Sequence, residues 1–165
     1  MIAAVLAHPC PESFVAAAFE RVVAALSGNN EVARLDLYAD SYEPDLPLSC
    51  VHRRALEQSS TLVLVYPTWW SSQPAILNAW LVAAAEQDLR HITRLVCVTT
   101  HGGGRVTNRV IGQAGRVTVA RAFRARCAPS ASFEWIALYG LDRCGDARRQ
   151  SFLGRIDASF GLQRR

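Results

Sequence analysis

Two adjacent tryptophans follow an apolar run of the sequence, in a place where aromatic rings can bind a flat ligand. The run covers residues 61–66, and the chain continues as Pro67-Thr68-Trp69-Trp70. Because neighbouring residues of a loop are seldom buried equally, we expect at least one indole ring to face a crevice. There it could pack against an aromatic ligand whose ring heteroatoms bond backbone N–H groups. The alternative is that both rings pack within the protein or at a dimer contact.

A second candidate segment, residues 8–14, follows an apolar run at 1–7 and leads into a helical pattern. Free N–H groups and the dipole at the start of a helix favour an anion such as phosphate. His8 and Ser13 can each donate a further hydrogen bond. The segment therefore indicates a phosphate site, although an ordinary capped turn has the same pattern.

A third segment combines hydrogen-bond donors with glycines. It follows a further apolar run and reads Thr99-Thr100-His101-Gly102-Gly103. Glycines let the backbone approach a ligand closely, and the threonine and histidine side chains supply donors. The alternative is a flexible connection without a ligand.

Alternating strand and helix patterns predict how these segments are brought together. Strands are predicted at 1–7, 31–36, 61–66, 95–99 and 133–139, and helices at 13–26, 51–58, 74–84, 115–126 and 146–160. Such alternation predicts a single α/β domain, residues 1–165, with helices on both faces of a five-stranded parallel sheet. The expected order is the flavodoxin-like 2-1-3-4-5, a three-layer sandwich. The segments after strands 1, 3 and 4 would then meet at the carboxyl edge, where ligands bind in such sheets.

The composition indicates a globular protein and excludes several classes of protein. Of the 165 residues, 50% are hydrophobic and 19% are charged, which excludes a disordered chain. None of the 18 basic residues is lysine, so neither a Schiff-base lysine nor a P-loop lysine is present. The five cysteines are irregularly spaced without a CxxC pair, so we expect no disulfide framework and no metal site.

The distribution of charge bears on partners and location. Residues 1–88 hold four arginines and ten acidic residues, net −6, whereas residues 89–133 hold eight arginines and no acidic residue. The basic segment could bind an anionic cofactor or substrate, or form a solvated helix face. It lacks interleaved aromatic residues, so no nucleic-acid partner is expected. No run is long enough to span a membrane and no signal peptide is recognisable, so a cytoplasmic protein without a membrane partner is expected.

Taken together, these motifs resemble one known family. The residues that carry the resemblance run through nearly the whole chain and are densest between Tyr66 and Trp80. They are His8-Pro9, Ser13-Phe14, Asp36-Leu37-Tyr38, Tyr66-Pro67-Thr68-Trp69-Trp70, Pro74-Ala75-Ile76-Leu77, Trp80, Thr99-Thr100-His101-Gly102-Gly103 and Ala137-Leu138-Tyr139-Gly140-Leu141-Asp142. On these residues the chain resembles the flavodoxin-like NAD(P)H dehydrogenase (quinone) family, which includes modulator of drug activity B.

The resemblance implies a homodimeric flavoprotein that holds FMN, or FAD, at the dimer interface. It would be an oxidoreductase that reduces quinones, or another small acceptor, with NAD(P)H. In such enzymes the flavin carries the hydride, while the protein positions and tunes its ring. The resemblance also implies His101 as the catalytic residue and three groups of flavin-binding residues. These are His8, Ser13 and Phe14 at the phosphate, Pro67, Thr68, Trp69 and Trp70 along the isoalloxazine, and Thr99, Thr100, Gly102 and Gly103 at the ring's other edge.

A second hypothesis is a protein of the same fold that has lost flavin chemistry. It would be a small-molecule-binding or dimerisation module, or a non-redox enzyme acting on an aromatic substrate in the same crevice. Two observations motivate it. Only residues 81–94 separate the Trp80 helix from the next strand, where family members carry a longer segment that closes over the flavin, and Val15 stands where many members have a polar residue. In addition, no tyrosine follows the glycine segment to act as a proton donor to a quinone.

Overall fold

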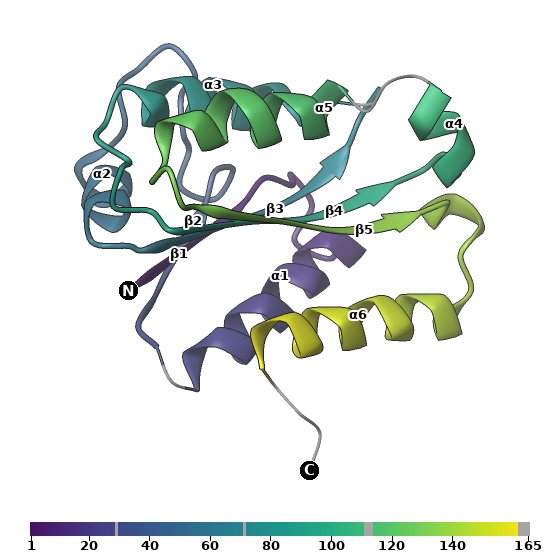
Figure 1. Cartoon of the computed structure of the whole chain (residues 1–165). Coiled ribbons are helices and arrows are strands. Elements are labelled where there is room, and N and C mark those ends of the chain that lie inside the picture. The colour runs from purple at the N-terminus through teal and green to yellow at the C-terminus, as the bar shows by residue number, and fades with distance from the viewer. Residues whose placement is uncertain (29, 71, 111–113, 162–165) are drawn as a thin grey trace.

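Five parallel strands form one sheet in the order β2-β1-β3-β4-β5, as the sequence predicts (Figure 1). The strands are β1 (Ile2–Leu6), β2 (Val32–Asp36), β3 (Thr61–Thr68), β4 (Arg94–His101) and β5 (Ser132–Tyr139). This computed structural model describes residues 1–28, 30–70, 72–110 and 114–161. Because all four pairings are parallel, every strand ends at the same edge of the sheet.

Helices cover both faces of the sheet (Figure 1). On one face lie α1 (Phe14–Ser27) and α6 (Asp146–Phe160), and on the other lie α2 (Cys50–Glu57), α3 (Ala75–Ala85) and α5 (Ala114–Val117). The short α4 (Arg105–Val110) follows β4 and is not predicted from the sequence. Within the described residues, none of these helices is long and apolar enough to cross a membrane.

The predicted helix at 115–126 is helical but irregular. After α5 the chain forms a π-helical turn, η1 (Thr118–Phe123), and then a 3-10 turn, η2 (Arg124–Arg126). A further 3-10 turn, η3 (Leu141–Arg143), connects β5 to α6. The hydrogen-bond pattern therefore changes twice within one helical segment, which apolar spacing alone does not reveal.

The sheet divides the core in two because successive side chains of a strand point to opposite faces. Tyr66 and Trp80 are the largest side chains of the cluster beneath α2 and α3. Phe19 and Phe152 fill the cluster beneath α1 and α6. The continuous apolar run at the N-terminus forms a strand buried on both faces, as predicted.

An ion pair joins the two helices of the second cluster. Nε and Nη2 of Arg21 on α1 donate to the two carboxylate oxygens of Asp157 on α6, at 2.6 and 2.5 Å. Asp157 is buried, and a bidentate pair of this kind fixes geometry as well as adding energy. The pair therefore holds α6 in place alongside α1.

Two strands extend further toward the candidate site than the sequence predicts. β3 continues through Pro67 to Thr68, and β4 continues to His101, each two residues beyond its expected end. A proline usually ends a paired strand because it has no N–H to donate. Since β1 pairs with β3 only as far as Val65, that side of Pro67 has no neighbouring strand, and the missing donor costs no ladder hydrogen bond.

Candidate functional site

The carboxyl edge of the sheet brings together the three segments singled out in the sequence. The segment at 8–13 follows β1, the tryptophans follow β3 and the glycines follow β4, and these three strands are neighbours. This edge lies at the right of Figure 1. Register places Thr68 opposite His101, and His101 opposite Tyr139 on β5. The candidate site is therefore one continuous edge.

The first turn of α1 provides a helix N-terminus for an anion. Ser13 is the N-cap, and its Oγ accepts a hydrogen bond from the N–H of Ala16 at 3.1 Å. No acidic residue lies in this first turn, so no carboxylate there repels a negative charge. Val15 points its side chain into the core. Backbone N–H groups and the Ser13 hydroxyl together fit a phosphate.

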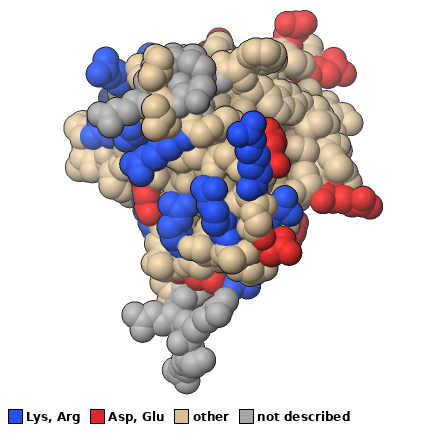
Figure 2. Space-filling view, turned by 90° about the vertical axis from the view of Figure 1, so that its right-hand side faces the viewer, with Lys and Arg blue, Asp and Glu red and all other residues tan. Residues whose placement is uncertain are grey.

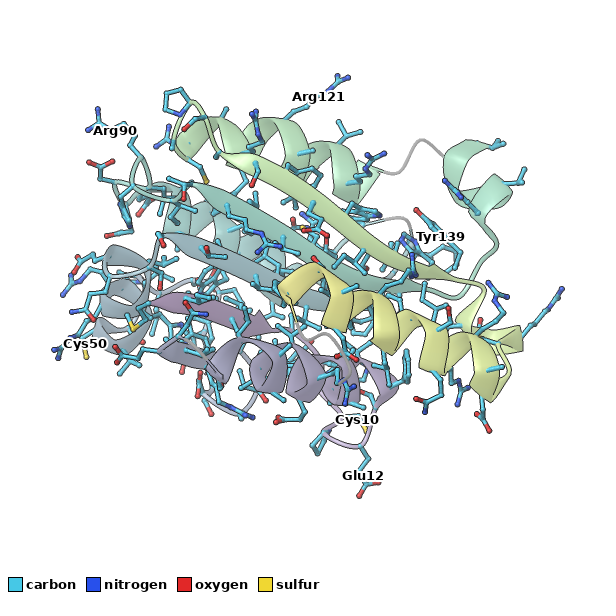
Figure 3. The ribbon with its side chains drawn as sticks, turned by 60° about the horizontal axis from the view of Figure 1, so that its bottom comes forward. Cys10, Glu12, Cys50, Arg90, Arg121 and Tyr139 are labelled. Atoms are coloured by element: carbon cyan, nitrogen blue, oxygen red, sulfur yellow. The ribbon has the colours of Figure 1, made fainter. Side chains whose placement is uncertain are left out.

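His8 lies in the same turn, from which Cys10 and Glu12 protrude (Figure 3). The N–H of Cys10 donates to Nδ1 of His8 at 3.0 Å. Nδ1 also lies 3.1 Å from the carbonyl oxygen of Cys10, so its role depends on the tautomer of the ring. In the tautomer whose Nδ1 accepts from the Cys10 N–H, the single proton of the neutral imidazole lies on Nε2. Because His8 is only half-buried, Nε2 can donate to a ligand at the start of α1.

Phe14, which the resemblance places at the phosphate, packs between α1 and α6. Its ring centroid lies 5.9 Å from that of Phe152, and the guanidinium carbon of Arg149 lies 5.8 Å from the Phe14 centroid. These contacts hold Arg149, a positive charge, near the first turn of α1. The contribution of Phe14 to an anion site is therefore to place that charge.

The two tryptophans belong to a tight turn that follows β3. The N–H of Trp69 donates to the carbonyl of Ser72, and the N–H of Ser72 donates to the carbonyl of Trp69, both at 2.9 Å. The Trp70 residue is 100% exposed and Trp69 is 44% exposed. Trp70 also has a φ of 50°, a left-handed conformation that bulky residues rarely adopt. A strained backbone thus presents an indole ring fully to solvent.

A glycine of α5 supports this turn from behind. A Cβ atom on Gly115 would lie 2.7 Å from Oε1 of Gln73 and 3.1 Å from Cα of Ser72, so only glycine allows α5 to approach so closely. Gln73 is buried, and its Nε2 donates to Oδ1 of Asn78 on α3 at 2.6 Å. Helices α5 and α3 therefore set the position of the tryptophan turn.

A cluster of polar side chains lies at the ends of β3 and β4. Oγ1 of Thr68 is 2.8 Å from Oγ1 of Thr99 and 3.4 Å from Nε2 of His101. Thr99 and His101 are buried, whereas Thr68 is half-buried and connects them to the surface. Pro67 and Thr100, a register pair, lie on the other face of the sheet because side chains alternate along a strand. The predicted residues are thus divided between the two faces.

Tyr139 joins this cluster, although sequence analysis finds no tyrosine after the glycine segment. Its ring stacks on His101 with centroids 4.4 Å apart and an interplanar angle of 18°. Figure 3 shows Tyr139 at the end of β5, next to the carboxyl edge. The topology could have identified it. In the order 2-1-3-4-5 the last strand lies beside β4, so the final residue of β5, Tyr139, lies opposite the final residue of β4, His101.

The glycines after β4 lie close to the segment that follows β5. A Cβ atom on Gly102 would lie 2.6 Å from Oδ2 of Asp142, and the carbonyl of Gly103 accepts a hydrogen bond from the N–H of Gly140 at 2.9 Å. Gly140 has a φ of 71°, which glycine adopts without strain. The glycine segment is therefore held against the end of β5.

Two groups beneath the site keep their protons. Burial raises the pKa of the Cys97 thiol to about 12, and burial also raises the pKa of the Tyr66 hydroxyl well above its ordinary value. Both groups are therefore neutral at physiological pH, and Cys97 is excluded as a nucleophile because the thiolate is the reactive form.

Residues 1–114 match a family model described as a flavodoxin-like fold. No curated protein matches the chain.

Solved structures share the fold over nearly the whole chain. Smu.1420 from Streptococcus mutans has a TM-score of 0.82 at 23% identity, covering 96% of this chain and 97% of its own. An NAD(P)H:quinone oxidoreductase from Methanothermobacter marburgensis has a TM-score of 0.75 at 18% identity, covering 96% and 94%. An FMN-dependent NADH-azoreductase from Bacillus anthracis, in complex with FMN, has a TM-score of 0.70 at 13% identity, covering 96% of each chain. At these identities the likeness establishes the fold.

Proposed function

The chain belongs to the family of proteins with the flavodoxin-like fold, and on that premise we propose that it is an FMN-dependent oxidoreductase. It would transfer electrons from NAD(P)H to a quinone or another small acceptor. The observation that carries the proposal is the pairing, at one edge, of a helix whose first turn holds no acidic residue and an exposed indole. FMN has the two matching parts, a phosphate and a flat ring. The names of two similar structures, an FMN-dependent NADH-azoreductase and an NAD(P)H:quinone oxidoreductase, support the proposal.

The phosphate of FMN would lie at the first turn of α1. Backbone N–H groups and the Ser13 hydroxyl would bind its oxygens, and Nε2 of His8 would add one donor. Arg149, held over the ring of Phe14, would add a longer-range attraction. The buried Val15 side chain removes no donor from this site, because the backbone supplies the N–H groups.

The isoalloxazine would lie beside Trp69 and Trp70, and its bound ring would supply the hydride chemistry. The indole rings would exclude water from one side of it. The half-buried Thr68 hydroxyl, held by Thr99 at 2.8 Å, would bond a heteroatom of the ring. Gly102 and Gly103 would lie toward the other edge of the ring. Thr99 and Thr100, which the family resemblance also places there, are buried on opposite faces of the sheet and would support that edge from within.

His101, the catalytic residue implied by the family resemblance, is 3% exposed. A side chain so deeply buried reaches a ligand through a neighbour, and Oγ1 of Thr68 lies 3.4 Å from its Nε2. We therefore assign His101 to the control of the Thr68 hydroxyl, with Tyr139 stacked on the imidazole to fix the plane of its ring. In this arrangement a proton can move between Nε2 and a ligand by way of Thr68.

We also propose that the protein is a homodimer. Trp70 and Val82 expose large apolar side chains on the tryptophan turn and on the neighbouring α3. A two-fold partner that covered them would also shield the flavin ring from water. Sedimentation at micromolar concentration tests this expectation, and a monomeric mass there would contradict it.

Titration with FMN tests the proposed function directly. Protein purified under native conditions should carry flavin absorbance, or gain it when FMN is added, and should then oxidise NADH or NADPH when a quinone is present. Trp70→Ala, which removes the exposed indole, should weaken FMN binding. Its matched control is Val51→Ala, a change at an exposed apolar residue of α2. If neither FMN binding nor NAD(P)H oxidation is found, the alternative is favoured, namely a protein of this fold that binds a small aromatic molecule without redox chemistry.

A further inference from the structure

A groove with arginines on both sides runs along the open edge of the sheet, beside β5. Its volume is about 620 Å³. Residues from four elements contribute its floor and walls. They are Trp135 and Tyr139 of β5, Arg148 and Arg155 of α6, Arg105 of α4 and Arg116 of α5. Figure 2, which views the carboxyl edge face on, shows arginine side chains gathered in the middle of this face.

Two of these arginines have neutral partners, so their charges are not compensated. Nη2 of Arg148 donates to the carbonyl of Tyr139 at 3.0 Å, and Nη2 of Arg155 donates to the carbonyl of Ala137 at 2.7 Å. Within the described part of the chain, no carboxylate lines the groove. Guanidinium groups with neutral partners, gathered in one concave site, favour a ligand with more than one negative charge.

The same hydrogen bonds argue against a peptide as the ligand. An added strand would need the outward carbonyls of β5 as acceptors, and Arg148 and Arg155 already donate to two of them. Side chains placed in this way protect an open sheet edge. A small anion, which needs only donors, is the ligand class that fits.

Aromatic rings in the groove further restrict the class of ligand that fits it. The rings of Tyr139 and Trp135 line the groove, and aromatic rings of this kind pack against flat ligands. A volume of about 620 Å³ also exceeds what one phosphate needs. A molecule with a flat heterocycle and phosphate groups would contact the aromatic rings and the arginines together, and nucleotides have this composition.

We propose that this groove binds the phosphate groups of a nucleotide. Resting on the proposed function, we infer that the nucleotide is the adenosine end of NADPH, whose additional phosphate distinguishes it from NADH. The groove adjoins the candidate site: Tyr139 lines the groove and stacks on His101, and His101 contacts Thr68. A dinucleotide could therefore extend from the groove toward a bound flavin.

Calorimetric titration with adenosine 2′,5′-bisphosphate tests the groove without any turnover. The unmodified protein should bind this probe more tightly than adenosine 5′-monophosphate, and rising salt should weaken the binding. Arg105→Ala and Arg155→Ala should each raise the Kd of the bisphosphate about tenfold or more, the loss expected for one charged hydrogen bond. Arg121→Ala removes an exposed arginine that points away from the molecule (Figure 3) and should leave the Kd unchanged.

Arg105 keeps the test independent of folding, because its side chain is exposed. Unchanged Kd in both groove variants, or no binding of the bisphosphate at millimolar concentration, would overturn the proposal. Equal loss of affinity in Arg121→Ala would overturn it as well, since the effect would then be one of general charge.

Steady-state kinetics separates this proposal from the proposed function. If the enzyme is active, Arg105→Ala should raise the KM for NADPH more than the KM for NADH. Tight, arginine-dependent binding of the bisphosphate by a protein that oxidises neither dinucleotide would support the groove as a site for a free nucleotide and reject the redox function. If the protein is active with NADPH and both groove variants keep the KM of the unmodified protein, the redox function is supported and the groove is rejected as the NADPH site.

Discussion

Replacing His8 by alanine should separate the binding of FMN from that of riboflavin. The two ligands differ only by the phosphate, which we place at the first turn of α1. His8→Ala removes the Nε2 donor, whereas the backbone N–H groups and the Ser13 cap remain. The change also removes the hydrogen bond between Nδ1 and the Cys10 N–H, so the comparison with riboflavin isolates its effect on the phosphate.

The expected loss of FMN affinity follows from the one hydrogen bond to the phosphate that His8→Ala removes. A hydrogen bond to a charged acceptor contributes about 1.5–3 kcal/mol, which corresponds to about 10- to 150-fold in Kd. His8 is half-buried, and partial exposure to water favours the lower end of that range. We expect FMN to bind about tenfold more weakly and riboflavin to bind with unchanged Kd.

Quenching of flavin fluorescence measures both constants. Cys10→Ser is the matched control, because it changes an exposed side chain of the same loop and preserves the backbone N–H that bonds Nδ1. An equal loss of affinity for both flavins in His8→Ala would refute the phosphate assignment. So would equal, weak binding of FMN and riboflavin by the unmodified protein.

Four further predictions concern the tryptophan turn and the thiols. Trp70→Ala should weaken FMN binding by up to a few kcal/mol, the contribution of a large aromatic contact, and an unchanged Kd would exclude that contact. Gly115→Ala should lower the free energy of unfolding by about 1–3 kcal/mol through overpacking against Gln73. Its control, Gly154→Ala, meets no atom within 4 Å and should instead stabilise α6 by about 0.5–1 kcal/mol. A thiol reagent should modify the exposed Cys10 and Cys50 quickly and the three buried cysteines only on unfolding. Since the Cys97 thiol ionises near 9.0 in an unfolded chain and at about 12 when folded, the unfolded chain loses its proton first, and stability measured by denaturant titration should fall as pH rises through that window.

The sheet could be predicted because its signals are local. The apolar runs at 1–7 and 61–66 have the composition of strands buried on both faces, and the structure places β1 and β3 at the centre of the sheet. The predicted end of β3 was wrong. A proline in the sequence usually indicates that a paired strand stops, but here the neighbouring strand β1 has already ended before Pro67. Whether Pro67 interrupts a strand depends on a partner that sequence spacing does not describe.

The polar cluster depended on contacts between distant parts of the chain. Thr99 and His101 were identified as candidates, but their burial follows from β4 extending to His101 and from Tyr139 stacking on its ring. Likewise, the uneven charge left open whether the basic segment binds an anion or forms a solvated helix face. Arg105, Arg148 and Arg155 are separated by up to fifty positions and meet only because α4 and α6 flank the same open strand.

The left-handed backbone of Trp70 also matters for protein engineering. A glycine or an asparagine adopts a φ of 50° at lower cost than tryptophan, and relief of such strain is worth about 1–3 kcal/mol. A thermostability screen would therefore enrich Trp70→Gly, because the exposed ring makes no packing contacts whose loss would lower the melting temperature. If the ring serves a ligand, every variant gained in this way would melt later and bind less. Directed evolution of this scaffold thus needs selection for binding alongside selection for heat resistance.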